Sequence, residues 1–307
     1  MTDRTPAQND VRLGVFAAIG AYASWGVLPV YVRAVAFANV FEMLAHRILF
    51  TVPAALVIVF ALSGWTKGRQ EIAEALKPRM FWTLALSGVL LFLNWGTYLW
   101  SVVNHHLMEA ALAYFIAPLA QVLVGVLFFK EKLRTVQKIA IVFAALGVLA
   151  QGVALGAPPW IGVVICITWV AYAAVRKHAT VPAATGLLVE SAVLIPVAVG
   201  LLFWVSQKSG LSFDDSVSNA FLLSLAGPAT AGPLVLFAIA VRRVSFSTLG
   251  VLQYLAPCMQ FLLAVIFGEP LGMLRVISFV LIWIALIAFT WDSLAARRAK
   301  KLVQTQA

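Results

Sequence analysis

Two long stretches of this 307-residue chain repeat one pattern of apolar residues and prolines. They cover residues 86–133 and 225–271, and each holds the motif Pro-x-x-Gln midway along an apolar segment. The motif residues are Pro118 and Gln121 in the first stretch and Pro257 and Gln260 in the second. An offset of 139 residues relates the two motifs without a gap. A repeat with so long a period indicates an internally duplicated fold.

The chain holds ten apolar segments, and its composition indicates which solvent surrounds them. Hydrophobic residues make up 63% of the chain and charged residues 11%, which lies outside the range of soluble domains. Each segment has roughly the 20 residues that an α-helix needs to cross a bilayer. Helices are the predicted spanning elements, because backbone in lipid must satisfy its own hydrogen bonds and no alternating barrel pattern is visible. The predicted spans are residues 13–33, 41–63, 81–101, 108–128, 137–156, 158–175, 185–206, 220–240, 247–267 and 274–292.

Lysine and arginine are distributed unequally between alternate connections. Of the 22 in the chain, 18 lie in the terminal segments and one set of alternate connections, three lie in the other set, and Arg47 lies within a span. The positive-inside rule therefore predicts that both termini are cytoplasmic. The basic residues behind the net charge of +10 form small clusters and no continuous face, so a nucleic-acid partner is not expected.

Each predicted half holds five spans, and five is an odd number. The second half therefore enters the membrane upside down relative to the first. Inverted repeats of this kind are typical of secondary transporters, whose substrate site lies near the midplane where the halves meet. An offset of 143 residues places Arg47 opposite Glu190. The predicted units are a tail at 1–12, a first repeat at 13–156, a second repeat at 158–292 and a basic tail at 293–307.

Several short motifs resemble those of one transporter family. They are Tyr-Ala-Ser-Trp-Gly at 22–26, Glu42-x-x-x-His46-Arg47, Asn94-Trp95, Val-Asn-His-His at 103–106 followed by Glu109-Ala110, Tyr-Phe-Ile-x-Pro at 114–118, and Ser-Thr-Leu-Gly-x-x-Gln-Tyr at 247–254. Together they resemble the RarD branch of the EamA family, in the drug/metabolite transporter (DMT) superfamily, over about residues 12 to 292. The resemblance implies ten helices in two EamA repeats, a central cavity and a bacterial inner-membrane location. RarD proteins carry the label chloramphenicol-sensitive protein or predicted permease, which establishes no substrate.

Charged residues within the predicted spans are the first candidates for function, because a charge at the centre of a spanning helix costs about 2.5–3.5 kcal/mol on insertion scales. Glu42 and His46 share a helix face, and Arg47 lies beside them. We expect Arg47 either to bind a substrate carboxylate or to form an ion pair with Glu42 or Glu190. Glu190 is the candidate proton carrier, and Glu42 and His46 are candidates for coupling or gating.

Amides and aromatic rings within the spans are candidates for contact with a substrate. Gln121 and Gln260 lie one helical turn beyond a proline, and each either contacts the substrate or holds two helices together. Asn94 is a polar residue in mid-span. Aromatic rings can stack on aromatic or cationic solutes in a cavity, although rings in membrane proteins also pack or anchor at the interface. The candidate rings are Trp25, Trp95, Trp100, Tyr114, Trp169 and Tyr254.

The polar hinge after the third span is predicted to lie outside the cell. His105 and His106 in this hinge have no third ligand at metal spacing, so no metal site is expected, and both are candidates for an external gate. Glu109 follows at the start of a helix, where it either caps the positive end of the helix or takes part in gating. Cys166 and Cys258 lie within apolar spans and are expected to be buried as free thiols.

The sequence predicts a secondary transporter that moves small organic metabolites, such as amino acids or amphiphilic drugs, by alternating access. Proton coupling stays open at this point, and the alternative function is a membrane sensor or scaffold without transport. An enzyme is not expected, because no Ser/His pair lies within a span and neither a GxGD aspartate nor the HExxH motif occurs. ATP-driven pumping is not expected, because no GxxxxGK[ST] loop occurs. We expect no cofactor, a small-molecule substrate and the lipid bilayer as partners, and a monomer or weak homo-oligomer.

Overall fold

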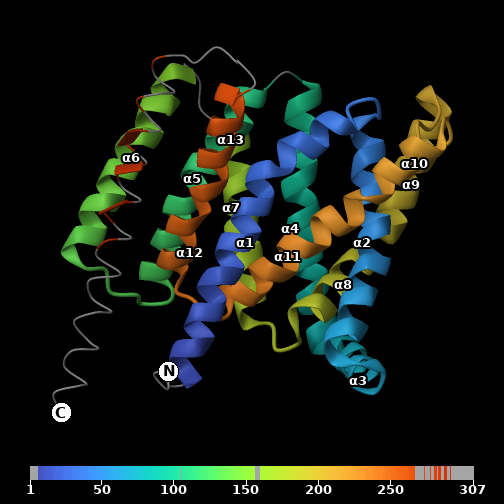
Figure 1. The fold of residues 1–307 in the computed structure, drawn as a ribbon, viewed down its shortest axis with the longest axis horizontal. Helices are drawn as coiled ribbons and strands as arrows, with labels where there is room; N and C mark the ends of the chain where they lie inside the picture. Colours follow the sequence, from blue (N-terminus) through green and yellow to red (C-terminus); the bar gives the residue numbers. More distant parts are fainter. Residues whose placement is uncertain are drawn as a thin grey trace.

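The structure is a computed structural model that describes residues 6–104, 106–155 and 160–266, with isolated positions between 273 and 291. Regular structure in these residues is entirely α-helical and forms one bundle (Figure 1). The helices are α1 (Pro6–Ala34), α2 (Val40–Ser63), α3 (Trp65–Ala75), α4 (Pro78–Val103), α5 (Leu107–Leu127), α6 (Thr135–Leu155), α7 (Trp160–His178), α8 (Ala183–Val193), α9 (Ile195–Ser209), α10 (Val217–Ser224), α11 (Ala226–Val241), α12 (Phe246–Gln253) and α13 (Leu255–Ile266).

The bundle has two ends that the chain visits in turn. α1 begins at the end that carries α3, and α10 lies at the opposite end (Figure 1). We call these the α3 end and the α10 end. α2, α5, α7 and α11 run from the α10 end to the α3 end, whereas α4 and the pair α8–α9 run the other way (Figure 1).

Most of the predicted spans are present as apolar helices. Six described helical segments are long and apolar enough to cross a membrane, and α8 with α9 makes a seventh if the pair, bent by 47°, is one span. α5 and α6 contribute the shorter apolar stretches Ile116–Leu127 and Thr135–Leu146. These helices lie where nine of the ten spans were predicted, to within a few residues. The tenth, at 274–292, lies outside the continuously described residues, so the count of ten stays a prediction.

Three of the spans are interrupted, which the apolar pattern did not predict. The breaks lie at Leu194 between α8 and α9, at Leu225 between α10 and α11, and at Tyr254 between α12 and α13. A proline follows each break by two or three residues, and these are Pro196, Pro228 and Pro257. Proline has no backbone N–H and its ring clashes with the carbonyl four residues earlier. The ladder of helical hydrogen bonds is therefore interrupted at these points.

The short helix α3 was also not predicted. It is polar on one face, and Gly64, with a φ of 71°, allows the sharp turn that separates it from α2. Glu71 on the inner face of α3 is buried and accepts hydrogen bonds from Ser63 of α2 at 2.8 Å and from Thr185 of α8 at 3.1 Å. This carboxylate therefore attaches α3 to the bundle.

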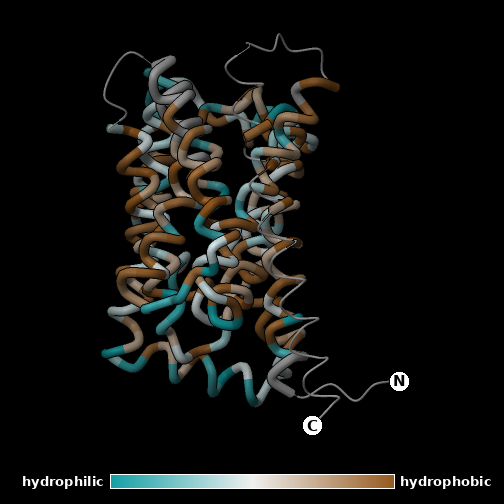
Figure 2. The backbone as a smooth tube through the Cα atoms, turned by 90° about the vertical axis from the view of Figure 1, so that its left-hand side faces the viewer, coloured by the Kyte–Doolittle hydropathy of each residue, from teal (hydrophilic) through white to brown (hydrophobic). Residues whose placement is uncertain are grey.

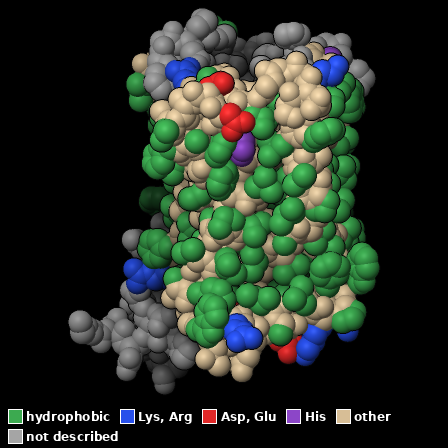
Figure 3. Space-filling view, turned by 90° about the vertical axis from the view of Figure 1, so that its right-hand side faces the viewer, with side chains coloured by type: hydrophobic (Ala, Val, Ile, Leu, Met, Phe, Trp, Pro, Cys, Tyr) green, Lys and Arg blue, Asp and Glu red, His purple; other side chains and the backbone are tan. Residues whose placement is uncertain are grey.

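Side-chain polarity distinguishes the ends of the bundle from its middle. Hydrophilic residues gather at the α3 end, and apolar residues dominate the middle (Figure 2). On the face in Figure 3, a broad area of hydrophobic side chains separates the Lys and Arg side chains near the two ends. Large apolar side chains are exposed on many helices, among them Phe16, Val57, Trp82, Leu123 and Phe203. So large an apolar surface indicates contact with lipid.

Two glycines allow close contacts between helices of the first and second halves of the chain. A Cβ atom at Gly88 of α4 would lie 2.9 Å from the backbone oxygen of Glu190 in α8. A Cβ atom at Gly227 of α11 would overlap the backbone carbonyl of Phe50 in α2. Because the obstacle is backbone in both places, a side chain could be accommodated only if a helix moved. α4 therefore packs directly on α8, and α11 packs directly on α2.

We predict that Gly227→Ala lowers the thermal stability of the purified protein in detergent, because the added methyl group separates α11 from α2. Gly232→Ala on the same helix is the matched control, since nothing lies within 4 Å of its Cβ position. Alanine favours a helix over glycine by about 1 kcal/mol, so the control should be neutral or stabilising. Equal melting temperatures for both variants would contradict the close contact.

Candidate functional site

The most unusual charged group in the bundle is the guanidinium of Arg47. It lies on α2, seven residues from the start of this helix at the α10 end. Its guanidinium carbon is 3.4 Å from the centre of the Trp95 ring on α4, in a cation–π contact. Its Nε atom is buried and has no hydrogen-bond partner among the described residues. The cation is therefore held over an aromatic ring with donor capacity left unused.

Three tyrosine hydroxyls are electrostatic neighbours of Arg47. They belong to Tyr31 of α1, Tyr98 of α4 and Tyr114 of α5. The rings of Tyr98 and Tyr114 meet edge to face with centroids 6.3 Å apart, and 38% of Tyr114 is accessible. The Tyr31 hydroxyl donates to the Leu222 carbonyl at 2.9 Å. Arg47 is thus surrounded by neutral hydrogen-bonding groups from three helices, and no described carboxylate forms an ion pair with it.

A cluster of five aromatic rings lies deeper in the bundle and joins α1, α7 and α11. Trp25 and Trp169 meet edge to face with centroids 5.3 Å apart, and both are partly exposed. The other members are Tyr22, Tyr172 and Phe237, which are buried. The Trp169 indole N–H donates to the Gln253 side chain at 3.2 Å, so its ring is fixed in orientation. We call these five residues the aromatic cluster.

Asn94 connects the surroundings of Arg47 to the aromatic cluster. It precedes Trp95 on α4, and its amide nitrogen donates to the Ile165 carbonyl at 2.7 Å and to the Thr168 hydroxyl at 3.1 Å. Both acceptors belong to α7, and Thr168 precedes Trp169. The amide therefore holds α4 and α7 in register at this level.

The remaining predicted substrate contacts have different surroundings. Gln260 donates to the Trp25 carbonyl at 3.2 Å and so ties α13 to α1. Gln121 is fully buried, and its side chain is the hydrogen-bonding neighbour of the buried Tyr22 hydroxyl. Tyr254 is buried in a separate apolar cluster with Ala140 and Cys258, next to α6. The structure therefore does not bring Tyr254 into the group around Arg47.

Glu190 forms an ion pair with Arg176, so the expected pairs of Arg47 with Glu190 or Glu42 are wrong. The Arg176 Nη1 and Glu190 Oε1 atoms are 3.3 Å apart, and each side chain is 1% exposed. Ser87 of α4 also donates to Glu190. Glu190 lies seven residues from the start of α8 at the α3 end, whereas Arg47 lies seven residues from the start of α2 at the α10 end. Arg47 and Glu190 thus lie equally far along their helices, but the two helices start at opposite ends of the bundle. The two side chains therefore lie far apart.

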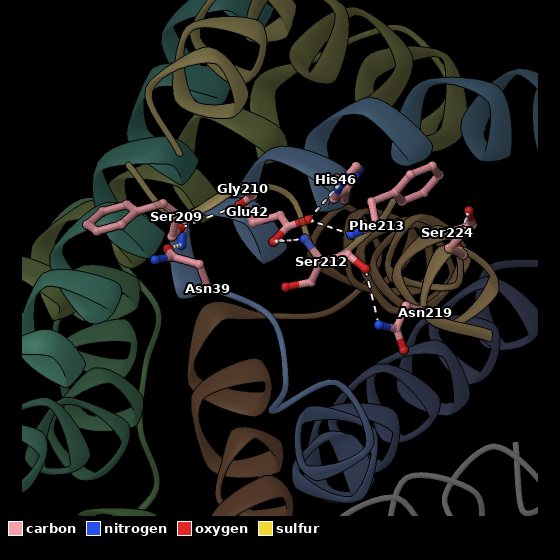
Figure 4. Close-up of polar contacts among 11 residues, drawn as sticks. Asn39, Glu42, His46, Ser209, Gly210, Ser212, Phe213, Asn219 and Ser224 are labelled. Carbon is pink, nitrogen blue, oxygen red and sulfur yellow. Dashed lines mark hydrogen bonds and ion pairs between the residues drawn. The ribbon is translucent and has the colours of Figure 1, made fainter. Parts of the chain in front are cut away.

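Glu42 binds backbone at the α10 end instead of an arginine. Its carboxylate accepts hydrogen bonds from the backbone N–H groups of Ser212 at 3.1 Å and Phe213 at 2.9 Å, in the α9–α10 loop (Figure 4). The His46 ring stacks on Phe213 with centroids 4.6 Å apart, and its Nε2 atom is 3.6 Å from the Glu42 carboxylate. Asn219 donates to the Ser212 carbonyl at 3.1 Å (Figure 4). Glu42 and His46 therefore join the first half of the chain to a loop of the second.

Glu131 makes a similar contact at the α3 end, and the sequence analysis missed it. Its carboxylate accepts from the backbone N–H groups of Phe246 at 2.7 Å and Ser247 at 2.9 Å, at the start of α12. Lys177 of α7 donates to the carbonyls of Val241 and Val244 in the preceding turn, at 3.1 and 3.0 Å. Each end of the bundle thus has a carboxylate from the first half that binds backbone N–H groups of the second half.

The histidine hinge is described only in part. The His106 ring stacks on Trp100 with centroids 5.7 Å apart. His105 and the side chain of Glu109 lie outside the described residues. No group of three or more potential metal ligands occurs in the part of the chain that the structure describes. Cys166 and Cys258 are buried free thiols, which confirms their prediction.

Several residues of the site were not singled out in the sequence. Tyr31 and Tyr98 gave no signal, because tyrosines near the ends of spans are commonly interfacial anchors. Arg176 was counted as a loop cation, but it is buried within α7. Its position could have been inferred from the offset of 143, which relates it to Arg33 as it relates Glu190 to Arg47.

In the part of the chain that the structure describes, a helical bundle with interrupted apolar spans, an apolar belt and an internal cation without a carboxylate partner has the features of a multi-pass membrane transporter. Comparison with known proteins agrees. Residues 12–151 match the EamA-like transporter family. The chain is 36% identical to Protein RarD of Streptomyces exfoliatus, over 98% of this chain and 96% of that protein. The chain belongs to the RarD group of the EamA-like transporters.

Other relatives extend this result across bacteria. Protein RarD of Escherichia coli (strain K12) is 36% identical over 94% of this chain and 98% of its own length. The uncharacterized transporter YojE of Bacillus subtilis (strain 168) is 33% identical over 95% of this chain and 98% of its own length. A solved crystal structure with 19% sequence identity superposes with a TM-score of 0.69 and covers 93% of this chain and 98% of that chain, which shows a shared fold. These relatives support a multi-pass protein of the bacterial inner membrane.

We predict that Glu42→Gln makes the α9–α10 loop exchange its amide hydrogens faster. The amide side chain keeps one acceptor oxygen, so at least one of the Ser212 and Phe213 N–H groups loses its partner. Losing a hydrogen bond to a charged acceptor costs about 1.5–3 kcal/mol, which corresponds to exchange roughly tenfold faster or more. Hydrogen exchange read by mass spectrometry measures this, with the exposed Glu74→Gln as the control. Unchanged protection of the loop would disprove its attachment by Glu42.

Proposed function

We propose that this protein is a secondary transporter of small organic solutes that carry a carboxylate group, and that Arg47 binds this carboxylate. The observation that supports the proposal most strongly is the Arg47 guanidinium, which has no carboxylate partner among the described residues and whose Nε donor is unpartnered there. The relatives support the transporter class, and the geometry around Arg47 supports the class of solute.

The cost of an internal charge is the main argument for a carboxylate ligand. A central charge in a spanning helix costs about 2.5–3.5 kcal/mol on insertion scales, and such residues usually mark substrate pathways. A guanidinium offers five N–H donors in a planar fork that matches a carboxylate with two parallel hydrogen bonds. Trp95 stabilises the cation without neutralising it. Tyr31, Tyr98 and Tyr114 supply further hydroxyl groups near the same point.

The apolar part of the solute is proposed to contact the aromatic cluster. Trp25 and Trp169 are the partly exposed members of that cluster, and Asn94 holds the helices between it and Arg47. Amino acids with apolar side chains and amphiphilic aromatic acids combine a carboxylate with such a body. Gln121 is a further proposed contact, because its amide can both donate and accept and lies next to Tyr22 of the aromatic cluster.

Alternating access by two inverted halves is the proposed mechanism. The equivalent close contacts of Gly88 with α8 and of Gly227 with α2, related by the offset of 139, support the duplication. Glu42 and Glu131 join the two halves at opposite ends of the bundle. In alternating access, the contacts of one glutamate would break while those of the other stay formed. His46, His106, Glu109 and Glu190 are the other proposed coupling or gating residues, and the proton is the proposed coupling ion.

Counterflow in proteoliposomes tests the function directly. The panel holds labelled amino acids, organic acids, aromatic cations and chloramphenicol, each with and without a pH gradient. We expect saturable exchange of at least one carboxylate. If folded protein exchanges no panel member and no component of a broad metabolite extract, transport is rejected in favour of a sensor or scaffold.

We predict that Arg47→Gln weakens the apparent affinity for a transported carboxylate by about tenfold or more, since it removes a charge-assisted hydrogen bond. Arg47→Lys should restore the charge without the planar fork and therefore recover part of the affinity. The measurement is the concentration dependence of counterflow, using phenylalanine and its amide, which lacks the carboxylate, as the first pair. Arg79→Gln, which changes an exposed cation, is the control. Wild-type affinity and rate in Arg47→Gln would exclude Arg47 as the carboxylate site.

We predict that both termini are cytoplasmic, because the connections on their side carry most of the Lys and Arg residues. A green fluorescent protein fused after residue 307 should be fluorescent in intact cells. Alkaline phosphatase fused at the same point should be inactive, because it folds only in the periplasm. The reverse pattern would invert the proposed orientation.

A further inference from the structure

The proposed function leaves unexplained a second internal guanidinium, that of Arg176 near the α3 end. We propose that Arg176 is a second binding residue for the transported carboxylate, and that Glu190 occupies it in place of the solute until Glu190 takes up a proton. This inference rests on the proposed function, since it concerns where the same solute binds later in the transport cycle.

The ion pair with Glu190 does not use all the hydrogen-bond donors of Arg176. Its side chain is 1% exposed. Nη2 donates to the Ala183 carbonyl at 3.0 Å, but Nε and Nη1 are buried without a hydrogen-bond partner among the described residues. Nη1 approaches Glu190 Oε1 only to 3.3 Å, beyond the usual range of a charge-assisted hydrogen bond. Nε is therefore unused among the described residues, and Nη1 is held by Glu190 only at a long distance.

The space around Arg176 fits the planar group closely. A Cβ atom at Gly186 of α8 would overlap the guanidinium, so the glycine allows it to lie flat against that helix. Glu190 is in turn held from two sides, by the Ser87 hydroxyl of α4 and by a side-chain hydrogen bond from Tyr172 of α7. Its Oε2 atom has no geometric hydrogen-bond partner among the described residues. Glu190 is thus a carboxylate that neutralises Arg176 without using its full hydrogen-bonding capacity.

The pair lies about two helical turns from Asn94 and Trp169, toward the α3 end. Toward the α3 end, Ser87 lies seven residues from Asn94 on α4, and Arg176 lies seven residues from Trp169 on α7. Ser87 precedes Asn94 in the chain because α4 and α7 run in opposite directions. Seven residues of helix correspond to about 10 Å and to nearly two full turns, so each pair lies on one helix face. Tyr172, between Trp169 and Arg176, belongs to the aromatic cluster and also bonds to Glu190. Tyr172 thus links the aromatic cluster to the Arg176–Glu190 pair.

The repeat offers a reason for the difference between the two ends. The offset of 143 relates Arg33 to Arg176 and Arg47 to Glu190. The first half thus has an arginine at both positions, and the second half has an arginine and a glutamate. At the α3 end, Glu190 supplies Arg176 with the kind of carboxylate partner that Arg47 does not have among the described residues. We infer that a solute carboxylate at Arg176 would substitute for Glu190.

The exchange of carboxylates balances charge at every step. When Glu190 takes up a proton, it becomes neutral and Arg176 can bind the solute carboxylate. When the solute leaves toward the α3 end, Glu190 releases its proton on the same side and pairs with Arg176 again. If Glu190 takes up its proton from the α10 side, one proton crosses in the same direction as one solute. The charge that crosses is then zero for a monocarboxylate anion and +1 for a zwitterionic amino acid.

Polar and charged groups from several helices face Glu190 or lie near it. Tyr172 and Arg176 face it from α7, and Ser87 faces it from α4. Glu71 of α3 reaches the neighbouring turn of α8 through Thr185. Arg242 at the end of α11 is an electrostatic neighbour of Arg176 and donates to the Val181 carbonyl at 2.7 Å. Glu71 and Arg242 lie on the α3 side of the pair.

The test compares two charge-neutral double variants in proteoliposomes. Arg176→Gln with Glu190→Gln removes both charges of the buried pair, and Lys77→Gln with Glu74→Gln removes an exposed pair at 2.6 Å as the matched control. The probe is labelled phenylalanine or, if the wild type does not exchange it, the panel carboxylate that it does exchange. Counterflow rate, apparent affinity and the pH dependence of both are measured, with folding checked by gel filtration and thermal unfolding.

We expect the buried double variant to keep the wild-type apparent affinity at Arg47 but to exchange about tenfold more slowly or worse, since one charge-assisted binding step is lost. Its exchange rate should also lose the pH dependence of the wild type. The single variant Glu190→Gln should likewise lose the pH dependence, and it serves alone if the double variant does not fold. Wild-type rate and pH dependence in the folded variants would overturn the inference and leave the pair a structural one. If the wild type exchanged no carboxylate at all, the proposed function itself would be rejected.

Discussion

Hydrocarbon cannot solvate a charge or a peptide group, and this constraint governs the arrangement of every polar residue inside the bundle. Glu42 and Glu131 show the usual solution, because each carboxylate accepts hydrogen bonds from backbone N–H groups that begin a new segment. One interaction satisfies an anion and two otherwise unpaired donors. It also joins the two halves of the chain at each end, where a transporter must be able to separate them.

Arg47 represents the other solution, in which aromatic and hydroxyl groups, and no described carboxylate, surround a charge. Its neighbours come from α1, α4 and α5, and they are a tryptophan face and three hydroxyls. These groups stabilise a cation without neutralising it. At the α3 end, Arg176 is neutralised by Glu190 but still has unused donors. The two guanidiniums therefore differ in that only Arg176 has a carboxylate partner among the described residues.

The interrupted helices contribute to the same arrangement. Breaks at Leu194, Leu225 and Tyr254 follow from prolines two or three residues later. Glycines at Gly88 and Gly227 bring α4 against α8 and α11 against α2, so that helices of the two halves touch at the backbone. Close packing by small residues replaces the hydrophobic effect, which supplies no net attraction between helices in lipid.

The sequence by itself determined the helical membrane fold, the places of nine spans and the family, because apolar runs and motifs are properties of contiguous residues. It also pointed to Arg47 and Glu190 as unusual. It could not identify their partners: the offset that suggested contact between them states only that they are equivalent, and equivalent residues lie at opposite ends of the bundle. Tertiary structure alone decided that Trp95, Tyr31, Tyr98 and Tyr114 surround Arg47 and that Arg176 is buried beside Glu190. Such contacts depend on how separate helices rotate and pack, and no pattern along a single helix specifies that rotation.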